Sequence, residues 1–265
     1  MNQIKLVVFD VDGTLVPRGS NQIVPSAIQA IKQLKENGYE ILIATGRPFY
    51  FVLDTVKETV NPDYYVTING TCLLDKTGTI IETHHLDFTT VETLIRLAKE
   101  YQFSLGFKYA DVLRVYNQYE RFVSLYAKDH PEFKKDIIED FDKYYQQQLP
   151  LGGFFFSDDI GLEAVKQALP ELPIAPAVKG AYDLYPTGVD KTKTIETVLN
   201  KLNITWEQVI SFGDGENDID MLQKAKIGVA MGNASAIVKN HADYITKDIL
   251  EDGILHALKQ FELLK

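Results

Sequence analysis

The chain has 265 residues, a net charge of −10 and an ordinary globular composition, 45% hydrophobic and 24% charged. This acidic balance argues against a general nucleic-acid or anionic-membrane binder. No apolar stretch reaches membrane-spanning length and no signal-peptide pattern opens the chain, so we expect a cytoplasmic protein. The single cysteine, Cys72, excludes an internal disulfide and a zinc cluster of the Cys-x-x-Cys kind.

The first predicted element is a strand at Leu6–Phe9, a short apolar run of the kind that is buried on both faces. It ends in Asp10, Asp12 and Gly13. The carboxyl ends of such strands are where open α/β sheets bind ligands. A plain polar turn explains this stretch about equally well when it is taken alone, whereas a calcium loop lacks its further ligands.

Predicted helices and strands then alternate along the chain. A helix opening at Pro25 is followed by a strand over 40–44 that ends in Thr45-Gly46, and a helix is expected from about Phe49 to Val60. A third strand, 64–68, ends in Asn69-Gly70. Strand and helix in alternation predict a parallel sheet with right-handed crossovers.

From Thr83 to Asp183 the order changes to that of an α+β module with aromatic strands. We expect helices over 90–101, 122–145 and 162–169, and strands over 104–109, 112–116 and 152–157. The first pattern resumes after Pro186, with a helix over 191–202 and a buried strand over 209–212. The predicted division is therefore a core of 1–82 and 184–265 with an inserted domain, 83–183.

A second acidic cluster, Gly213-Asp214-Gly215-Glu216-Asn217-Asp218, follows the strand over 209–212. Asp218 stands where a dinucleotide fingerprint would have its third glycine, so a bare pyrophosphate would be repelled. Carboxylates of this kind suit Mg²⁺ shared with a substrate phosphate, although capping of the next helix is a simpler role.

Two further positions could bind phosphate. Thr45-Gly46 offers a hydroxyl and backbone N–H groups at a strand end, a common and weak signal. Lys191 follows Asp190, which excludes a P-loop because a glycine is required there. Lys191 is then either a solvated lysine at a helix start or a counter-charge for phosphate, and the acidic neighbours favour the second.

Together these stretches resemble the haloacid dehalogenase-like hydrolase superfamily, most closely its Cof-type phosphatases. Asp10-Val11-Asp12-Gly13-Thr14 resembles the first family motif, Thr45 the second, Lys191 the third and 213–218 the fourth. Asn69-Gly70, 231–234 and 251–253 resemble further signatures, over essentially the whole chain. Thr71 and Thr192 depart from the usual alanine and glycine, which affects fine geometry and removes no reacting group.

The resemblance implies an α/β fold, a Rossmann-like parallel-sheet core with an inserted α+β cap. It implies a Mg²⁺-dependent phosphatase in which Asp10 is the nucleophile and Asp12 the general acid and base. Asp10, the backbone carbonyl of Asp12 and Asp214 would hold the metal, with Asp218 bound to it directly or lying just behind. The groups expected to bind the phosphoryl group are Thr45, Gly46, Lys191 and Asn217.

The expected partner is a small phosphorylated metabolite, with sugar phosphates first and pyridoxal phosphate or flavin mononucleotide next. Aromatic residues of the insert, including Phe107, Tyr109 and 154–156, either stack on a substrate ring or form the core. A phosphomutase-like phosphotransferase and a catalytically silent binding module are the alternatives. A mutase would need more cap arginines than Arg96, Arg114 and Arg121. We expect a monomer or a weak dimer.

Overall fold

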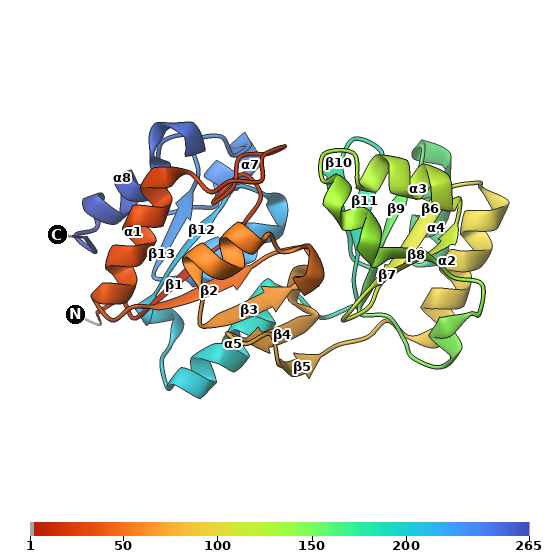
Figure 1. The fold of residues 1–265 in the computed structure, drawn as a ribbon, viewed down its shortest axis with the longest axis horizontal. Coiled ribbons are helices and arrows are strands. Elements are labelled where there is room, and N and C mark those ends of the chain that lie inside the picture. The colour runs from red at the N-terminus through yellow and green to blue at the C-terminus, as the bar shows by residue number, and fades with distance from the viewer. Residues whose placement is uncertain (1–2, 265) are drawn as a thin grey trace. The chain divides into compact units, whose positions relative to one another are not determined.

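The computed structural model describes residues 3–264, which form two compact units (Figure 1). The first unit holds the described parts of 1–45 and 190–265, together with Val52–Ile81. The second holds Gly46–Phe51 and Glu82–Val189. The second unit is therefore an insertion, with a short piece of chain from the preceding loop packed against it.

A sheet of eight strands within the described residues forms the first unit, in the order β14-β13-β12-β1-β2-β3-β4-β5. Its strands pair in parallel from β14 through to β3, and β4 is antiparallel to β3. This confirms the predicted α/β class with a parallel-sheet core. The strands are β1 (Leu6–Phe9), β2 (Glu40–Ala44), β3 (Tyr64–Thr67), β4 (Cys72–Asp75), β5 (Ile80–Thr83), β12 (Val209–Gly213), β13 (Ile227–Ala230) and β14 (Tyr244–Ile245).

Helices cover both faces of this sheet, as the fully apolar central strands require. Apolar residues of α5 and α6 pack on one face, in a cluster that includes Val8, Leu42 and Ile195. On the other face α1 contacts α8 and β2 (Figure 1). The helices are α1 (Pro25–Glu36), α5 (Lys191–Leu202), α6 (Ile219–Lys224), α7 (Ala236–Lys239) and α8 (Gly253–Gln260).

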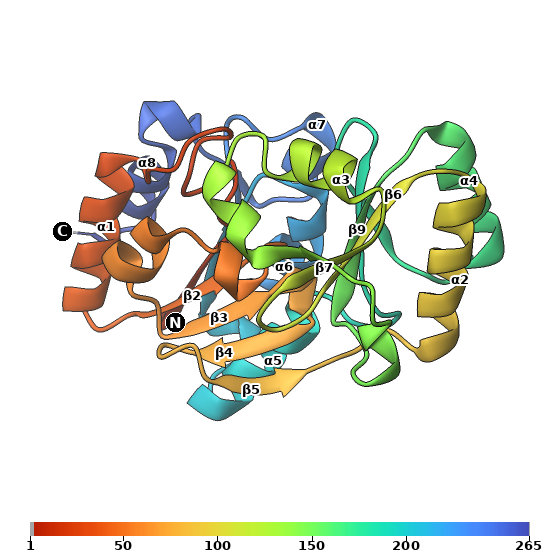
Figure 2. The same cartoon turned by 45° about the vertical axis from the view of Figure 1, so that its right-hand side comes forward.

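The second unit is a six-stranded sheet in the order β10-β11-β9-β6-β7-β8. Its strands pair antiparallel apart from β7 and β8. Figure 2 shows α2 and α4 lying side by side on it. The elements are α2 (Phe88–Glu100), β6 (Ser104–Lys108), β7 (Leu113–Asn117), α3 (Tyr119–Tyr126), β8 (Ile137–Glu139), β9 (Gly152–Phe156), α4 (Asp159–Ala168), β10 (Ile174–Val178) and β11 (Ala181–Leu184).

The aromatic residues of this unit are mainly its core. Phe107, Tyr109 and Phe155 are buried in one cluster with apolar residues of α2 and α4. The residues on either side of Phe155 in β9, Phe154 and Phe156, pack edge to face against one another and against Phe122. Of the two interpretations of these aromatic residues, the structure therefore favours the core for all five.

Two predicted helices are much shorter than expected. The segment 122–145 ends its helix at Tyr126 and then forms a 3-10 turn from Pro131 and the strand β8. Pro131 has no N–H to continue a helix, and its ring restricts the preceding residue to extended backbone. The segment 49–60 forms a 3-10 turn at Phe49–Phe51 and a π-helical turn at Val56–Val60. Its many β-branched residues are weak α-helix formers.

The sheets also define where the insert begins and ends. β5 includes Thr83 and belongs to the first sheet, whereas β11 extends to Leu184 and pairs with β9 of the second. Among the described residues, no helix is both long and apolar enough to cross a membrane.

Candidate active site

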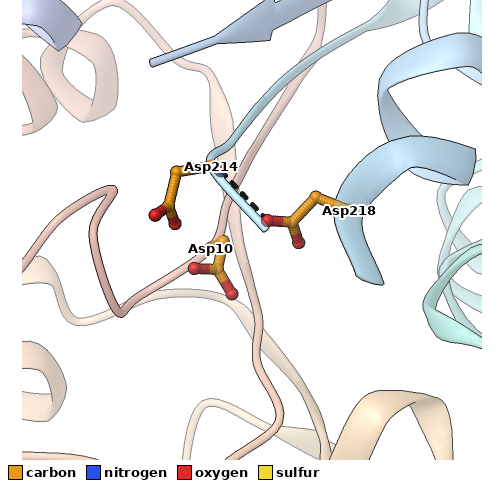
Figure 3. Close-up of side chains that lie close together, drawn as sticks. All are labelled: Asp10, Asp214 and Asp218. Carbon is orange, nitrogen blue, oxygen red and sulfur yellow. Dashed lines mark hydrogen bonds between the residues drawn. The ribbon is translucent and has the colours of Figure 1, made fainter. Parts of the chain in front are cut away.

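Two aspartates follow neighbouring parallel strands. Phe9 of β1 pairs with Phe212 of β12, and the amide of Asp10 still donates to the carbonyl of Phe212 at 3.0 Å. Asp10 and Asp214 therefore emerge at the same sheet edge. Carboxylate oxygens of Asp10, Asp214 and Asp218 lie within 4.8 Å of one another, and all three residues are buried (Figure 3). Residues that lie far apart in the sequence thus form one acidic cluster.

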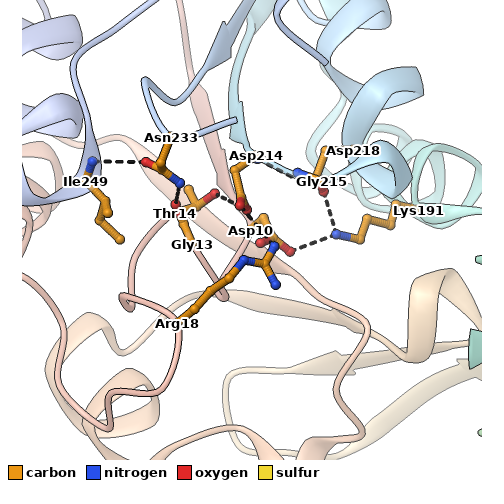
Figure 4. A network of polar contacts seen from close by, with 10 residues as sticks. All are labelled: Asp10, Gly13, Thr14, Arg18, Lys191, Asp214, Gly215, Asp218, Asn233 and Ile249. Carbon is orange, nitrogen blue, oxygen red and sulfur yellow. Dashed lines mark hydrogen bonds and ion pairs between the residues drawn. The ribbon is translucent and has the colours of Figure 1, made fainter. Parts of the chain in front are cut away.

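Gly13 allows this approach. Its φ is +90°, and a Cβ placed on it would lie 2.2 Å from Oδ2 of Asp214, so no other residue fits without displacing that carboxylate. The amide of Asn233 donates to the carbonyl of Gly13 at 2.8 Å, and its oxygen accepts from the backbone N–H of Ile249 at 3.0 Å (Figure 4). The turn after β1 is thereby fixed to the C-terminal part of the same unit.

The Lys191 side chain is the central cation, with only 1% of its surface exposed. Its Nζ lies 2.9 Å from Oδ1 of Asp10 and 2.6 Å from Oδ1 of Asp218 (Figure 4). Lys191 is the first residue of α5, and the side chain of Asp190 caps that helix by accepting from Lys193 N at 2.9 Å. A buried ammonium needs such partners, because an unpaired charge there is strongly destabilising.

Burial and charge act in opposite directions on these groups. Burial, reinforced by Asp218, raises the pKa of Asp10 well above its usual range, and Lys191 opposes that rise. Burial alone would lower the pKa of Lys191, but Asp10 and Asp218 outweigh it and raise the pKa. Burial likewise raises the pKa of Asp214, against the opposing effect of Arg18. The cluster holds more carboxylates than this one ammonium neutralises, which favours a further cation.

Asp218 is occupied on both oxygens. Oδ1 accepts from Lys191, while Oδ2 accepts from the backbone N–H of Asp214 at 3.1 Å and of Gly215 at 3.0 Å. Asp218 thus holds Lys191 and the loop that carries Asp214. The buried oxygens of Asp10 and Asp214 are hard ligands, and such a donor set fits a divalent ion such as Mg²⁺.

Arg18 also lies at this cluster and was not among the predicted site residues. Its Nη2 is 3.0 Å from Oδ2 of Asp214, although 59% of the Arg18 side chain is exposed. Asp214, Asp10 and Asp12 together raise the pKa of Arg18, against the lowering effect of burial. The sequence holds no signal for this contact, since a single arginine in a loop belongs to no periodic pattern.

The Asn69-Gly70 turn contacts both the start of α5 and the turn that precedes α6. The amide of Asn217 donates to Oδ1 of Asn69 at 2.9 Å, and the hydroxyl of Thr194 donates to the carbonyl of Gly70 at 2.5 Å. A Cβ on Gly70 would lie 2.2 Å from the carbonyl oxygen of Asp190. The backbone of Gly70 therefore packs directly against the residue that precedes Lys191.

The remaining predicted residues lie as follows. Thr45 is buried after β2, its N–H donating to Val66 O at 2.8 Å and its carbonyl accepting from Asn69 N at 3.1 Å. Asp12 is half-buried in the turn after β1. Gly46 is described with the second unit, where Lys108 donates to its carbonyl at 3.1 Å.

A parallel α/β sheet with two aspartates and a buried lysine at one edge defines a class of hydrolases. Residues 7–258 match the haloacid dehalogenase-like hydrolase family, and the chain belongs to it. The chain is 28% identical to the 5-amino-6-(5-phospho-D-ribitylamino)uracil phosphatase YcsE of Bacillus subtilis, over 98% of this chain and 96% of that one. It is also 28% identical to the pyridoxal phosphate phosphatase YbhA of Escherichia coli, over 94% and 96% respectively.

Among solved structures, the chain resembles the sugar phosphatase BT4131 of subclass IIB of the same superfamily. The two superpose with a TM-score of 0.87 at 28% sequence identity, over 98% of this chain and 100% of the other. The similarity to this structure covers 98% of the chain, and the predicted family is therefore confirmed for both units.

The packing of Gly70 against Asp190 predicts that Gly70→Ala destabilises the protein more than an ordinary glycine substitution. Gly38 is the matched control, since its φ of +83° is also positive but nothing lies within 4 Å of an added Cβ. We expect a loss of about 1 kcal/mol for Gly38→Ala from backbone strain alone, and at least about twice that for Gly70→Ala. Urea unfolding of both variants tests this, and equal losses would contradict the packing argument.

Proposed function

We propose that this protein hydrolyses small phosphate monoesters, sugar phosphates first among them, through an aspartyl-phosphate on Asp10. The observation that carries the proposal is the buried pair of Asp10 and Lys191 beside Asp214. A carboxylate held by a fixed ammonium at a strand end is placed to attack and is partly neutralised. The family and the names of the relatives support phosphoryl chemistry of this kind.

The charges explain why an anionic nucleophile needs such surroundings. At about 4 Å, two like unit charges repel by roughly 4 kcal/mol at an effective dielectric of 20. A phosphate dianion therefore approaches Asp10 only where cations offset the repulsion. Lys191 supplies one such cation, and it also stabilises the charge that spreads over the phosphoryl oxygens during transfer.

Asp10, the backbone carbonyl of Asp12 and Asp214 would hold a further cation, Mg²⁺. When bound, Mg²⁺ neutralises carboxylate and phosphate charge and orients the phosphoryl group. Asp218 would not bind the metal directly in this proposal, because its oxygens already hold Lys191 and the loop of Asp214. Its role is to keep both of those groups in place.

Asp12 would act as the general acid and the general base. It would protonate the departing alkoxide in the first step and accept a proton from the attacking water in the second, when the aspartyl-phosphate is hydrolysed. The hydroxyl of Thr45 and the N–H of Gly46 would bind phosphoryl oxygens. Asn217 would fix the Asn69 turn next to them, as its hydrogen bond to Asn69 suggests.

The substrate class rests on the relatives. Their names give a ribityl phosphate, pyridoxal phosphate and sugar phosphates, all of which are small monoesters. Sugar phosphates remain the first choice, because the aromatic residues that would suit a flat cofactor ring belong to the core of the second unit.

A phosphomutase is disfavoured by the arginines of the insert. Arg96 pairs with Glu100 at 2.9 Å, Arg121 donates to Gln118 at 2.9 Å, and Arg114 stacks on the ring of Tyr144. Each is already engaged within the second unit, whereas a mutase must bind a second phosphate on its substrate.

The first test is release of inorganic phosphate from a panel of sugar phosphates, pyridoxal phosphate and flavin mononucleotide. We expect release in the presence of Mg²⁺ and its loss after treatment with EDTA, restored when Mg²⁺ is added back. An isomerised sugar phosphate without net release would indicate the mutase. Absence of turnover on the whole panel would indicate the silent module.

The second test replaces the nucleophile. Asp10→Asn keeps the side-chain volume but removes the attacking charge, so kcat/KM should fall by at least about three orders of magnitude. Asp54→Asn is the control, since its side chain is 86% exposed, and it should keep wild-type activity. Retention of a tenth of the activity by Asp10→Asn, with contaminating phosphatase excluded, is incompatible with the mechanism.

The third test separates the two steps. Asp12→Ala keeps the backbone carbonyl and leaves Asp10 to attack. An alkyl phosphate should then fail at the first step, because its alkoxide leaves poorly without an acid. p-Nitrophenyl phosphate needs no acid, so stopped-flow measurement should give a burst of up to about one nitrophenolate per site before a slow steady state.

Asp10→Asn serves as the control without a burst. Near wild-type rates on both substrates would rule out the role assigned to Asp12.

A further inference from the structure

Arg18 is an exposed cation that covers a buried carboxylate. It lies in the loop between β1 and α1, and its Nη2 is 3.0 Å from Oδ2 of Asp214. The Asp214 side chain is 5% exposed, whereas that of Arg18 is 59% exposed. Figure 4 shows Arg18 extending towards Asp214 at the cluster. The guanidinium therefore approaches the acidic cluster from the solvent side.

The two cations of the cluster divide the carboxylates between them. Lys191 bonds Asp10 and Asp218, while the ion pair of Asp214 is made by Arg18. They differ in how firmly they are held. Lys191 is 1% exposed and bonds two buried carboxylates, so moving its ammonium away would leave charges buried without a partner. Arg18 extends from a loop on a side chain that is 59% exposed, so it can move into solvent once another cation neutralises Asp214.

The carboxylate that Arg18 bonds is also one that a metal ion would need. Asp214 belongs to the group of buried carboxylates whose oxygens lie within 4.8 Å of one another. A guanidinium on Oδ2 uses a lone pair of that carboxylate, and its positive charge repels a divalent ion nearby. The guanidinium and a metal ion therefore compete for the carboxylate of Asp214.

We propose that Arg18 is the resident counter-cation of Asp214 and that a divalent ion must displace it in order to bind. Arg18 holds the Asp214 carboxylate in place beside Asp10 until the ion arrives, and it weakens the affinity of the site for that ion. The inference rests on the metal site of the proposed function. It concerns the protein before substrate is present, and the test needs no turnover.

The test is a calorimetric titration with Mg²⁺ alone, at constant ionic strength, of the wild type and Arg18→Gln. Removal of the competing charge should tighten Mg²⁺ binding about fivefold. Arg96→Gln is the matched control, because its side chain is 60% exposed and also makes a single 2.9 Å ion pair, in the other unit. It removes the same net charge and should bind Mg²⁺ as the wild type does.

Melting temperatures give an independent reading. In EDTA, Arg18→Gln leaves Asp214 without its cation, so it should melt below Arg96→Gln, and Mg²⁺ should raise its melting temperature by more than that of the wild type. Arg18→Lys keeps the charge, and its Mg²⁺ affinity should lie between those of the wild type and Arg18→Gln.

Equal Mg²⁺ affinities in the wild type and Arg18→Gln would overturn the inference while leaving the metal site intact. Weaker binding by Arg18→Gln would also overturn it, because Arg18 would then support the ion. Failure of the wild type itself to bind Mg²⁺ would overturn the metal site and the inference together, so the two failures are distinguishable.

Discussion

The salt bridges of Lys191 are the interaction on which the site depends. Its ammonium joins the strand end of β1, through Asp10, to the turn after β12, through Asp218. Removing one partner of a buried ion pair costs about 3–5 kcal/mol, because the other charge stays buried and unpaired. The second oxygen of Asp218 in turn holds the loop of Asp214, because it accepts hydrogen bonds from the backbone N–H groups of Asp214 and Gly215. One ammonium therefore orients the carboxylate of Asp10 and, one hydrogen bond further, the loop that carries Asp214.

Backbone packing makes this arrangement rigid. Gly70 lies against the residue before Lys191, and Gly13 lies against the carboxylate of Asp214, each at a distance that excludes a Cβ. A few fixed contacts between loops of one sheet edge set the geometry of the acidic cluster. Arg18 is the exception, because it is exposed and extends from a loop. The cluster thus combines a buried cation, Lys191, with an exposed one, Arg18.

The sequence predicted those parts whose physical causes are local. The buried strands are continuous apolar runs, and the site residues Asp10, Asp214 and Lys191 stand directly after strands or at a helix start. Contacts between residues far apart in the sequence produce no local pattern. The ion pair of Arg18 with Asp214 is one example, and the hydrogen bonds of Asp218 to Lys191 and to the loop of Asp214 are another. The helix expected over 122–145 failed because apolar spacing alone does not exclude 3-10 turns and a short strand. The strand β10 contains Pro176, a residue that argues against a strand in the interior of a sheet. β10 lies at the edge of its sheet, where proline is tolerated.

The place of β1 in the sheet has a consequence for how the chain folds during synthesis. β1 leaves the ribosome first and finds β2 soon after, but its other neighbour, β12, follows the whole insert. Until then one edge of a fully apolar strand has no partner, which is the kind of edge that invites aggregation. The second unit has a sheet and a core of its own and can form in that interval. The pairing of β1 with β12 is therefore a late event, and the carboxylates of Asp10 and Asp214 meet only when it is complete.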